Sequence, residues 1–305
     1  MNEAKRQTAS FLRQRFDQAG IRPVTRYGQN FLTDLNLVEL LARTGNVEKR
    51  DVVLEVGTGT GGLTNLIAPD AAHVVTVEID PQLFVLAREE LRDRDNVTIL
   101  KVDALRNKNN FSREVLDAIA EQLAVDSQRR LKLVANLPYN IATPVISNLM
   151  RTEFTPAAMS VTIQKELGDR IVAAPNNKDY GALSAWLQSQ CRVELVRVMP
   201  PQVFWPRPKV HSAIVYIETD LARRQAIPDL DFWHAFGRGA FLHRRKFLRS
   251  CLLSAYKGQL DKPTVDQIMQ SQQIEANART EQLSVPRLLA LCEAVREAVQ
   301  KPTAT

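Results

Sequence analysis

The chain of 305 residues alternates between short apolar runs and longer segments in which apolar residues recur with a helical period. The short runs predict buried strands at residues 52–56, 73–78, 97–101, 131–135 and 159–163. The periodic segments predict helices near residues 61–68, 81–92, 112–124, 144–150 and 165–173. Alternation of this kind is typical of a mostly parallel sheet that helices cover on both faces.

Two further apolar runs, 193–198 and 212–217, follow without an obvious helix between them. We expect them to form an antiparallel pair that closes one edge of the sheet. Residues 219–230 carry charges and Pro228, and this composition is typical of a linker. After the linker only helices are expected, at residues 231–257, 263–270 and 284–299.

These elements predict two domains, an α/β domain over residues 1–219 and a small all-α domain over residues 220–305. The α/β domain begins with a basic arm, residues 1–26, which holds six cationic residues against two acids. A helix and then an extended segment are expected there, because Pro23 disfavours helix just before it. The arm is interpreted either as a solvated leader or as a segment that docks on an anionic partner.

The first strand runs into a glycine-rich turn that precedes a helix. Gly57, Gly59 and Gly62 fit the G-x-G-x-x-G pattern of a nucleotide-binding strand-to-helix turn. Such glycines allow a tight turn, a close approach of the backbone to a ligand, and close packing of the helix on the strand. The motif alone also fits a turn that binds no ligand.

Acidic residues accompany three successive strands of the predicted sheet. Glu78 ends the second strand about 20 residues after the first glycine, where doubly wound folds place a carboxylate for ribose hydroxyls. Glu55 lies inside the first strand, and Asp103 follows the third, where it could accept a hydrogen bond from an adenine amine. Acids in these positions suit the ammonium, ribose and adenine of S-adenosylmethionine better than a pyrophosphate. The alternative is that Glu78 and Asp103 only cap the helices that follow them.

The fourth strand ends in Asn136-Leu137-Pro138-Tyr139, which we expect at the same edge of the sheet as the glycine turn. The Asn136 carboxamide oxygen and the Leu137 carbonyl could accept both N–H groups of an exocyclic amine, so that its lone pair points at a sulfonium methyl group. Pro138 would stiffen the turn, and Tyr139 offers a ring for a base that has left its stack. Most of the acceleration would then come from positioning. An ordinary turn after a strand is the alternative.

The glycine turn and Asn-Leu-Pro-Tyr together resemble the amino-methyltransferases that modify adenine. Three longer stretches narrow the resemblance: Tyr27-Gly28-Gln29-Asn30-Phe31-Leu32, Asn136-Leu137-Pro138-Tyr139-Asn140-Ile141 and Val203-Phe204-Trp205-Pro206-Arg207-Pro208-Lys209-Val210-His211-Ser212-Ala213. From about residue 20 to residue 300 the chain is similar to the small-subunit (16S-type) rRNA adenine dimethyltransferases of the KsgA/RsmA family. The resemblance implies a Rossmann-like α/β fold, dependent on S-adenosylmethionine, with a small C-terminal all-α domain.

The resemblance also extends the set of expected site residues. Contacts with S-adenosylmethionine are expected at Asn30, Leu32, Glu55, Gly57, Gly59, Glu78, Asp103, Ala104 and Asn136. The expected catalytic residues are Asn136, Leu137, Pro138, Tyr139 and Phe204, the last as a second face for the target adenine. The family dimethylates two adjacent adenosines in the 3′-terminal hairpin loop of small-subunit rRNA during late assembly. This rRNA, or a pre-30S-type particle, is therefore the expected partner.

One segment departs from the pattern of the family. Residues 106–130 are longer than is typical and carry an additional predicted helix at residues 112–124. The resemblance gives this helix no role, and it could alter access beside the catalytic turn. Smaller departures, such as Thr58 where proline is frequent, remove no polar contact.

A run of cations marks the predicted all-α domain. Residues 235–255 contain no acid and are predicted as one helix, on which Arg238, Arg245 and Arg249 fall within about 40° of one another. We expect this stripe to bind RNA phosphates, and a solvated helix face is the alternative. The expected RNA-binding residues are Arg207, Lys209, Arg238, Arg244, Arg245, Lys246 and Arg249.

Composition narrows the class of protein. The formal net charge of +6 favours an anionic partner. Cys191, Cys251 and Cys292 form no C-x-x-C pair, and the four histidines show no metal-ligand spacing, so neither a metal site nor a disulfide framework is expected. The sequence contains no apolar stretch of 18 residues and no signal-peptide core. We therefore expect a cytoplasmic, monomeric protein that does not enter membranes.

Three other functions are weighed against this expectation. A resistance-type methyltransferase of large-subunit rRNA would use the same chemistry, but Asn140-Ile141 and the Arg-Arg-Lys run favour the small-subunit type. A nucleic-acid-binding or ribosome-assembly factor could keep the fold without the activity, although the catalytic and acidic residues are intact. A nicotinamide oxidoreductase would also carry G-x-G-x-x-G, and separate titrations with S-adenosylmethionine and NADH distinguish the two.

Overall fold

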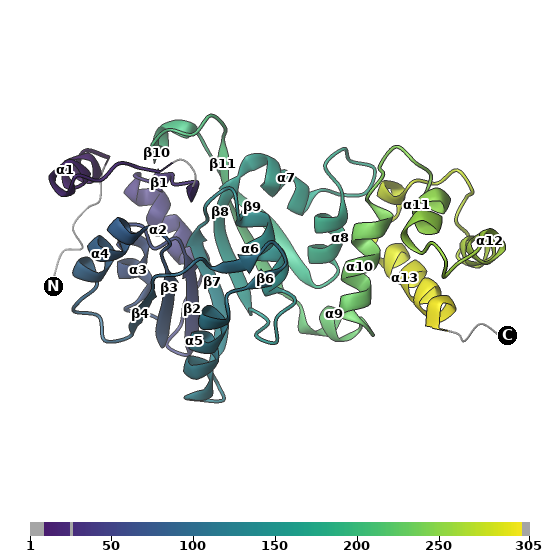
Figure 1. The fold of residues 1–305 in the computed structure, drawn as a ribbon, viewed down its shortest axis with the longest axis horizontal. Coiled ribbons are helices and arrows are strands. Elements are labelled where there is room, and N and C mark those ends of the chain that lie inside the picture. The colour runs from purple at the N-terminus through teal and green to yellow at the C-terminus, as the bar shows by residue number, and fades with distance from the viewer. Residues whose placement is uncertain (1–8, 25–26, 301–305) are drawn as a thin grey trace. The chain divides into compact units, whose positions relative to one another are not determined.

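The computed structural model describes residues 9–24 and 27–300 (Figure 1). The chain forms two compact units. The first holds residues 1–168 and 194–218, and the second holds residues 169–193 and 219–305. Each unit therefore combines two separate stretches of sequence.

A seven-stranded sheet organises the first unit. Its strands are β2 (Asp51–Val56), β3 (His73–Val77), β4 (Val97–Leu100), β7 (Arg130–Asn136), β8 (Ala158–Gln164), β9 (Cys191–Met199) and β11 (Ser212–Thr219). Their order across the sheet is β4-β3-β2-β7-β8-β11-β9. The first five strands of this order are parallel, so the predicted parallel strands are confirmed. β11 runs antiparallel to β8, and β9 lies beside β11 at the edge.

The chain order of the strands reverses at the centre of the sheet. β3 and β4 lie on one side of β2, whereas β7 and β8 lie on the other side. In open α/β sheets, the crevice at the carboxyl ends of two such central strands is where ligands bind. The glycine turn follows β2, and Asn136 is the last residue of β7, so both border this crevice.

Helices lie before and between the strands of this sheet in the chain. They are α1 (Ala9–Ala19), α2 (Leu35–Thr44), α3 (Gly62–Ile67), α4 (Pro81–Glu90), α5 (Arg113–Ala124), α6 (Ala142–Leu149) and α7 (Lys165–Val172). α2 and α3 share a core with Val53, Val74 and Val134 of the central strands. α5 contacts β2, β3 and β7, so the additional helix predicted within residues 106–130 is a sheet-covering element. The segment before it forms a short hairpin, β5 (Leu105–Asn107) and β6 (Asn110–Phe111).

The basic arm has a packed part. Two pieces of the predicted arm, residues 1–8 and 25–26, lie outside the described residues. Within α1, Leu12 and Phe16 are each 1% exposed, and Phe16 belongs to a core cluster with residues of α4. Arg15, on the polar face of α1, pairs with Glu90 of α4 at 2.7 Å. The interpretation as a solvated leader is therefore wrong for the described part of the arm.

The second unit is helical. Its helices are α8 (Ala182–Gln188), α9 (Leu221–Gln225), α10 (Leu230–Ala240), α11 (Leu248–Ala255), α12 (Lys262–Ser271) and α13 (Val285–Gln300). α8 packs against α10 and α13, and the Trp233 indole N–H donates to the Ser189 hydroxyl at 2.9 Å. Residues 169–193 thus belong to the second unit rather than to the α/β domain, which corrects the expected boundary. α9 lies within the predicted linker, where the Asp220 side chain caps it.

The single helix predicted over residues 231–257 is wrong. α10 ends at Ala240, and a turn over residues 241–247 leads into α11. A Cβ atom on Gly239 would lie 2.8 Å from the Cβ of Ala255, so this glycine lets α11 fold back closely on α10. Because the helix is broken, the three arginines that were predicted to share one helix face do not form a stripe.

Candidate active site

A cavity of about 470 Å³ lies in the first unit at the carboxyl ends of the central strands. It is lined by the glycine turn after β2, the acids after β3 and β4, and the turn after β7. The lining includes most of the predicted site residues, namely Asn30, Leu32, Glu55, Gly57, Gly59, Glu78, Asp103, Ala104, Asn136, Leu137 and Pro138. The glycine turn and the Asn136 turn therefore face one cavity, as the sequence predicts.

The glycine turn needs glycine at three positions. Gly57, Gly59 and Gly61 have φ angles of 91°, 58° and 81°, in the left-handed region that disfavours side chains. A Cβ atom on Gly57 would lie 3.3 Å from Pro138, and one on Gly59 would lie 3.2 Å from the Phe31 ring. The absence of side chains thus brings the turn against both the catalytic tetrapeptide and the segment that carries Asn30.

The Glu78 carboxylate accepts a hydrogen bond from the backbone of the glycine turn. The carboxylate is 4% exposed and accepts hydrogen bonds from the backbone N–H of Gly59 at 2.8 Å and of Asp80 at 2.9 Å. Burial raises its pKa to about 7. The helix cap of α4 is Asp80, whose side chain accepts from the N–H of Gln82, so the interpretation of Glu78 as a mere helix cap is wrong.

Glu55 is a second buried acid in the cavity wall. It is 1% exposed, and its Oε2 accepts hydrogen bonds from the hydroxyls of Thr64 and Thr76. Burial raises its pKa to about 8. Both hydroxyl donors to this carboxylate are neutral, so a cationic ligand group beside Glu55 would supply the missing positive charge.

Asp103 follows β4 and precedes the β5–β6 hairpin. Its Oδ1 accepts from the backbone N–H of Leu105 at 2.9 Å, which fixes the turn into the β5–β6 hairpin. No helix follows directly, so the helix-cap interpretation is wrong for this residue as well. Asp103 is exposed and lines the cavity together with buried Ala104, which leaves the second carboxylate oxygen for a ligand amine.

The Asn136 carboxamide has a fixed orientation. Its Nδ2 donates to the backbone carbonyl of Asn30 at 2.8 Å, so Oδ1 is the end that can accept a hydrogen bond from a substrate. The turn after it is also fixed, because the N–H of Leu137 donates to the carbonyl of Thr162 on β8 at 3.1 Å. This arrangement presents an acceptor oxygen at the cavity wall, as required to orient the amine of a base.

The two aromatic residues predicted for base stacking differ in position. Tyr139 is half-buried and is not among the residues that line the cavity, and its hydroxyl lies 2.5 Å from that of Ser212. Phe204 is 3% exposed and lies in strand β10 (Phe204–Trp205), which pairs with β1 (Phe31–Leu32). Its ring belongs to the core cluster around Leu41, so the structure buries Phe204, and its role as a second stacking face stays a prediction.

Comparison with known proteins agrees with this geometry. A family model described as ribosomal RNA adenine dimethylase matches residues 22–293. The chain belongs to the ribosomal RNA adenine dimethylase family. It is 37% identical over 281 residues to ribosomal RNA small subunit methyltransferase A of Lactiplantibacillus plantarum, covering 92% of each chain. It is 35% identical over 272 residues to the protein of the same name from Streptococcus mutans, covering 89% of this chain and 91% of the relative.

Two solved structures show the same fold. A dimethyladenosine transferase from Plasmodium falciparum superposes with a TM-score of 0.72 at 21% identity, over 88% of this chain and 98% of the other. The 23S rRNA methyltransferase ErmE superposes with a TM-score of 0.58 at 21% identity, over 87% of this chain and 99% of the other. The Rossmann-like α/β fold of S-adenosylmethionine-dependent methyltransferases is thereby confirmed for this dimethylase.

Sequence reasoning missed some residues of the site. Leu12 of α1 lines the cavity, although no motif covers it; its spacing from Phe16, one helical turn on, was the available signal. Gln29 links the arm to the acids, because its side chain accepts from the N–H of Val24 at 2.7 Å and donates to Asp80 at 3.0 Å. The family resemblance covers the stretch around Gln29, but it assigns only Asn30 and Leu32 of this stretch to the cofactor.

The predicted RNA-binding residues fall into three settings. Arg207 and Lys209 are exposed in the first unit, between β10 and β11. Arg238 is exposed on α10, and the turn after it exposes Arg244, Arg245 and Lys246. Arg249 is different, because both arms of its guanidinium pair with Asp266 of α12. Arg249 thus already has an ion-pair partner within the fold, and its role as a phosphate contact stays a prediction.

Among residues 9–24 and 27–300, no group of three or more histidine, cysteine, aspartate or glutamate side chains is placed to hold a metal ion. Within those same residues, every helix is too short or too polar to cross a membrane.

Proposed function

We propose that this chain is an S-adenosylmethionine-dependent rRNA adenine N6,N6-dimethyltransferase. Its substrate is a pair of adjacent adenosines in the 3′-terminal hairpin loop of small-subunit rRNA. The observation that carries this proposal is the Asn136 carboxamide, which lines the cavity and whose amide nitrogen donates to the Asn30 carbonyl, so that its oxygen is left as an acceptor. Family membership and the small-subunit relatives support the same substrate.

The cavity residues fit S-adenosylmethionine, which supplies the electrophilic methyl group. Two buried acids, Glu55 and Glu78, lie in one cavity without a cationic partner among the described residues, and this suits a ligand that is itself positively charged. Glu78 would accept from the ribose hydroxyls, and Asp103 would accept from the adenine amine. Glu55 would face the charged amino-acid end of the ligand.

The residues after β7 would hold the target base. The Asn136 oxygen and the Leu137 carbonyl accept the two N–H groups of the adenine amine, so that the nitrogen lone pair points away from them. The Tyr139 ring stacks on the base once it has left its helix. No strong base is needed among these residues, because the proton becomes acidic when the methyl group arrives.

The exposed cations would bind the RNA backbone. Arg244, Arg245 and Lys246 stand together in a short turn that contains no acid, with Phe247 48% exposed beside them. An aromatic ring next to several cations suits single-stranded nucleic acid. Arg238, Arg207 and Lys209 would add further phosphate contacts. We infer that the protein acts as a monomer on an assembling small-subunit particle in the cytoplasm.

A methylation assay on assembly particles tests this function. The purified protein is incubated with S-adenosylmethionine and small-subunit particles that lack the modification, and the rRNA is digested for mass spectrometry. We expect dimethyladenosine at two adjacent positions of the 3′-terminal hairpin loop. Large-subunit RNA is the parallel substrate, and exclusive methylation there would replace the small-subunit proposal. Methylation of neither RNA would leave the non-catalytic assembly factor as the better interpretation.

A further inference from the structure

The Tyr139 hydroxyl makes a contact that base stacking by itself does not require. Phenylalanine would offer an equivalent ring face, so the hydroxyl of Tyr139 serves something else. It lies 2.5 Å from the Ser212 hydroxyl, and Ser212 is completely buried. The contact joins the end of β7 to the start of β11, two strands away across the sheet.

The backbone holds Ser212 in place. Because β11 is antiparallel to β8, its first residue lies at the same edge as the carboxyl ends of the parallel strands, and Ser212 pairs with Gln164. The N–H of Lys165 donates to the carbonyl of His211 at 2.9 Å, which fixes the start of β11 one residue earlier. Ser212 is thus a rigid anchor beside the catalytic turn.

The Tyr139 side chain otherwise has two free torsions. Its neighbours in the turn, Pro138 and Asn140, line the cofactor cavity, whereas Tyr139 does not. A hydrogen bond at the far end of the ring fixes the ring plane that a stacked base must match. Burial raises the pKa of Tyr139 above its ordinary value, so the hydroxyl stays neutral and remains available for this bond.

We propose that Ser212 is a positioning residue, which sets the ring plane of Tyr139 and thereby the place of the target adenine relative to Asn136. This inference rests on the proposed function, because Ser212 acts only through Tyr139 and touches no reacting atom. It adds Ser212 to the site residues expected from the sequence. It also explains why a tyrosine, rather than any aromatic residue, fills position 139 here.

A double-mutant cycle tests the proposal. Ser212→Ala, Tyr139→Phe and the double variant are compared in single-turnover methyl transfer to unmethylated small-subunit particles at saturating RNA. We expect each single variant to slow transfer about tenfold, which is within the range for misplaced reacting groups. The double variant should be no slower than either single variant, and cofactor affinity should be unchanged in all three. Ser212→Thr keeps the hydroxyl and should restore the rate.

The matched control is Ser160→Ala. Ser160 is also fully buried, lies on the adjacent strand β8, and donates to the carbonyl of Leu41 at 2.9 Å. We expect it to lower the unfolding temperature as Ser212→Ala does, without slowing transfer. Unchanged transfer in Ser212→Ala, or losses that multiply in the double variant, would overturn the proposal.

A second cycle separates this inference from the proposed function. The same variants are compared in chemical unfolding, which reports the hydrogen bond whether or not RNA is a substrate. If the wild-type protein methylates no RNA, the proposed function fails and Ser212 has no base to position. If the wild-type protein methylates and both cycles show no coupling between Ser212 and Tyr139, only the positioning role fails.

Discussion

Strand β2 carries a buried carboxylate near each end, and the pKa values of the two are shifted in opposite directions. Asp51 begins the strand and Glu55 lies four residues later, and both are almost completely buried. Burial opposes ionisation of Asp51, but hydrogen bonds from Arg130 and Lys132 hold its pKa below the ordinary value. Glu55 accepts only from threonine hydroxyls, and burial raises its pKa to about 8. Asp51 has cationic partners within the fold, whereas the donors to Glu55 are neutral.

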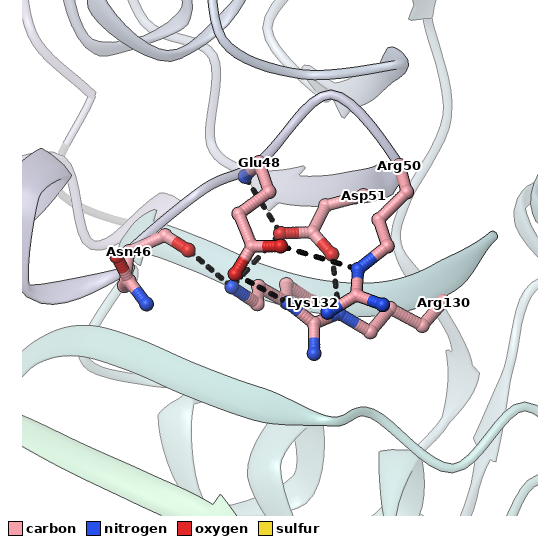
Figure 2. A network of polar contacts seen from close by, with 6 residues as sticks. All are labelled: Asn46, Glu48, Arg50, Asp51, Arg130 and Lys132. Carbon is pink, nitrogen blue, oxygen red and sulfur yellow. Dashed lines mark hydrogen bonds and ion pairs between the residues drawn. The ribbon is translucent and has the colours of Figure 1, made fainter. Parts of the chain in front are cut away.

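Figure 2 shows the ion pairs and hydrogen bonds around Asp51 at the amino end of β2. Asp51 lies 2.6 Å from Arg130 and 2.8 Å from Lys132, and it also accepts from the N–H of Glu48 at 2.8 Å. Lys132 further donates to the carbonyl of Asn46. This cluster joins β2 to β7 at the edge opposite the active site. We infer that the amino-end cluster serves stability and that the carboxyl end serves binding.

The largest effect is expected for Asn136→Ala at the carboxyl edge. Loss of the acceptor oxygen should slow methyl transfer by roughly 10²- to 10³-fold, the range for removing one positioned hydrogen-bonding group. Cofactor affinity should fall much less, and single-turnover kinetics with separate cofactor titration measure both. Asn148→Ala is the control, because this carboxamide donates to the carbonyl of Lys108 outside the cavity. Equal losses of rate and affinity would make Asn136 a cofactor residue instead.

Asp51→Asn should act on stability instead of catalysis. It leaves Lys132 buried without its counter-ion, and breaking such a pair costs about 3–5 kcal/mol. Urea denaturation measures the loss, and the transfer rate per folded molecule should stay the same. Glu48→Gln is the control in the same cluster, where an exposed partner should cost at most about 1 kcal/mol. A large loss of cofactor affinity in Asp51→Asn would contradict the division between the edges.

The pH dependence of stability should have opposite signs at the two edges. The pKa values of Glu55 and Glu78 are raised to about 8 and about 7, so the folded protein keeps protons that the unfolded chain loses from about pH 4.5 upward. Stability of the ligand-free protein should therefore fall as pH rises through this window, by about 1.4 kcal/mol per pH unit for each titrating group. Asp51, with its lowered pKa, loses its contribution only in acid, as pH falls below about 4.

Urea titrations across this pH range measure both slopes. The Glu55→Gln, Glu78→Gln double variant should flatten the loss between pH 5 and pH 8, because its side chains do not titrate. If the slope persists in the double variant, the buried acids of the cavity are not its cause.

The smallest expected effect is that of Glu55→Gln on its own. Glutamine keeps the size of the side chain and can accept from Thr64 and Thr76, so stability at about pH 4.5 and below, where Glu55 is protonated in the folded protein, should change by no more than about 1 kcal/mol. Affinity for S-adenosylmethionine should fall about tenfold, since the ligand loses an anionic partner. Isothermal titration measures this, with adenosine, which lacks the charged amino-acid end of the cofactor, as the control ligand. An equal loss for adenosine would place Glu55 away from the charged end of the cofactor.

The sequence predicted the sheet and most of the cavity because the signals there are local. The run 52–56 is apolar apart from Glu55, and the glycines that follow it favour a turn whatever lies around them. The acids and Asn136 then fall at the carboxyl edge because strand direction alone decides where a strand ends. None of these inferences needs knowledge of distant packing.

The features that the sequence missed depend on distant contacts. The break after Ala240 brings Gly239 against Ala255 of α11, a contact between residues 16 positions apart that the helical period does not predict. The sequence around Arg249 indicates no ion-pair partner, because its partner Asp266 comes from α12. Phe204 belongs to a motif, but its pairing with Leu32 turns it into the core. For Arg249 and Phe204, tertiary packing decides which neighbours the side chain contacts.

The contribution of Leu12 to the cavity wall ties cofactor exchange to the helix that carries it. Placing two methyl groups on one amine requires spent cofactor to be replaced between the transfers. Phe16 and the Arg15–Glu90 pair fasten this helix, so they bear on how quickly the replacement occurs. We expect Phe16→Ala to shift the ratio of monomethylated to dimethylated adenosine in the product, although no atom of Phe16 belongs to the chemistry.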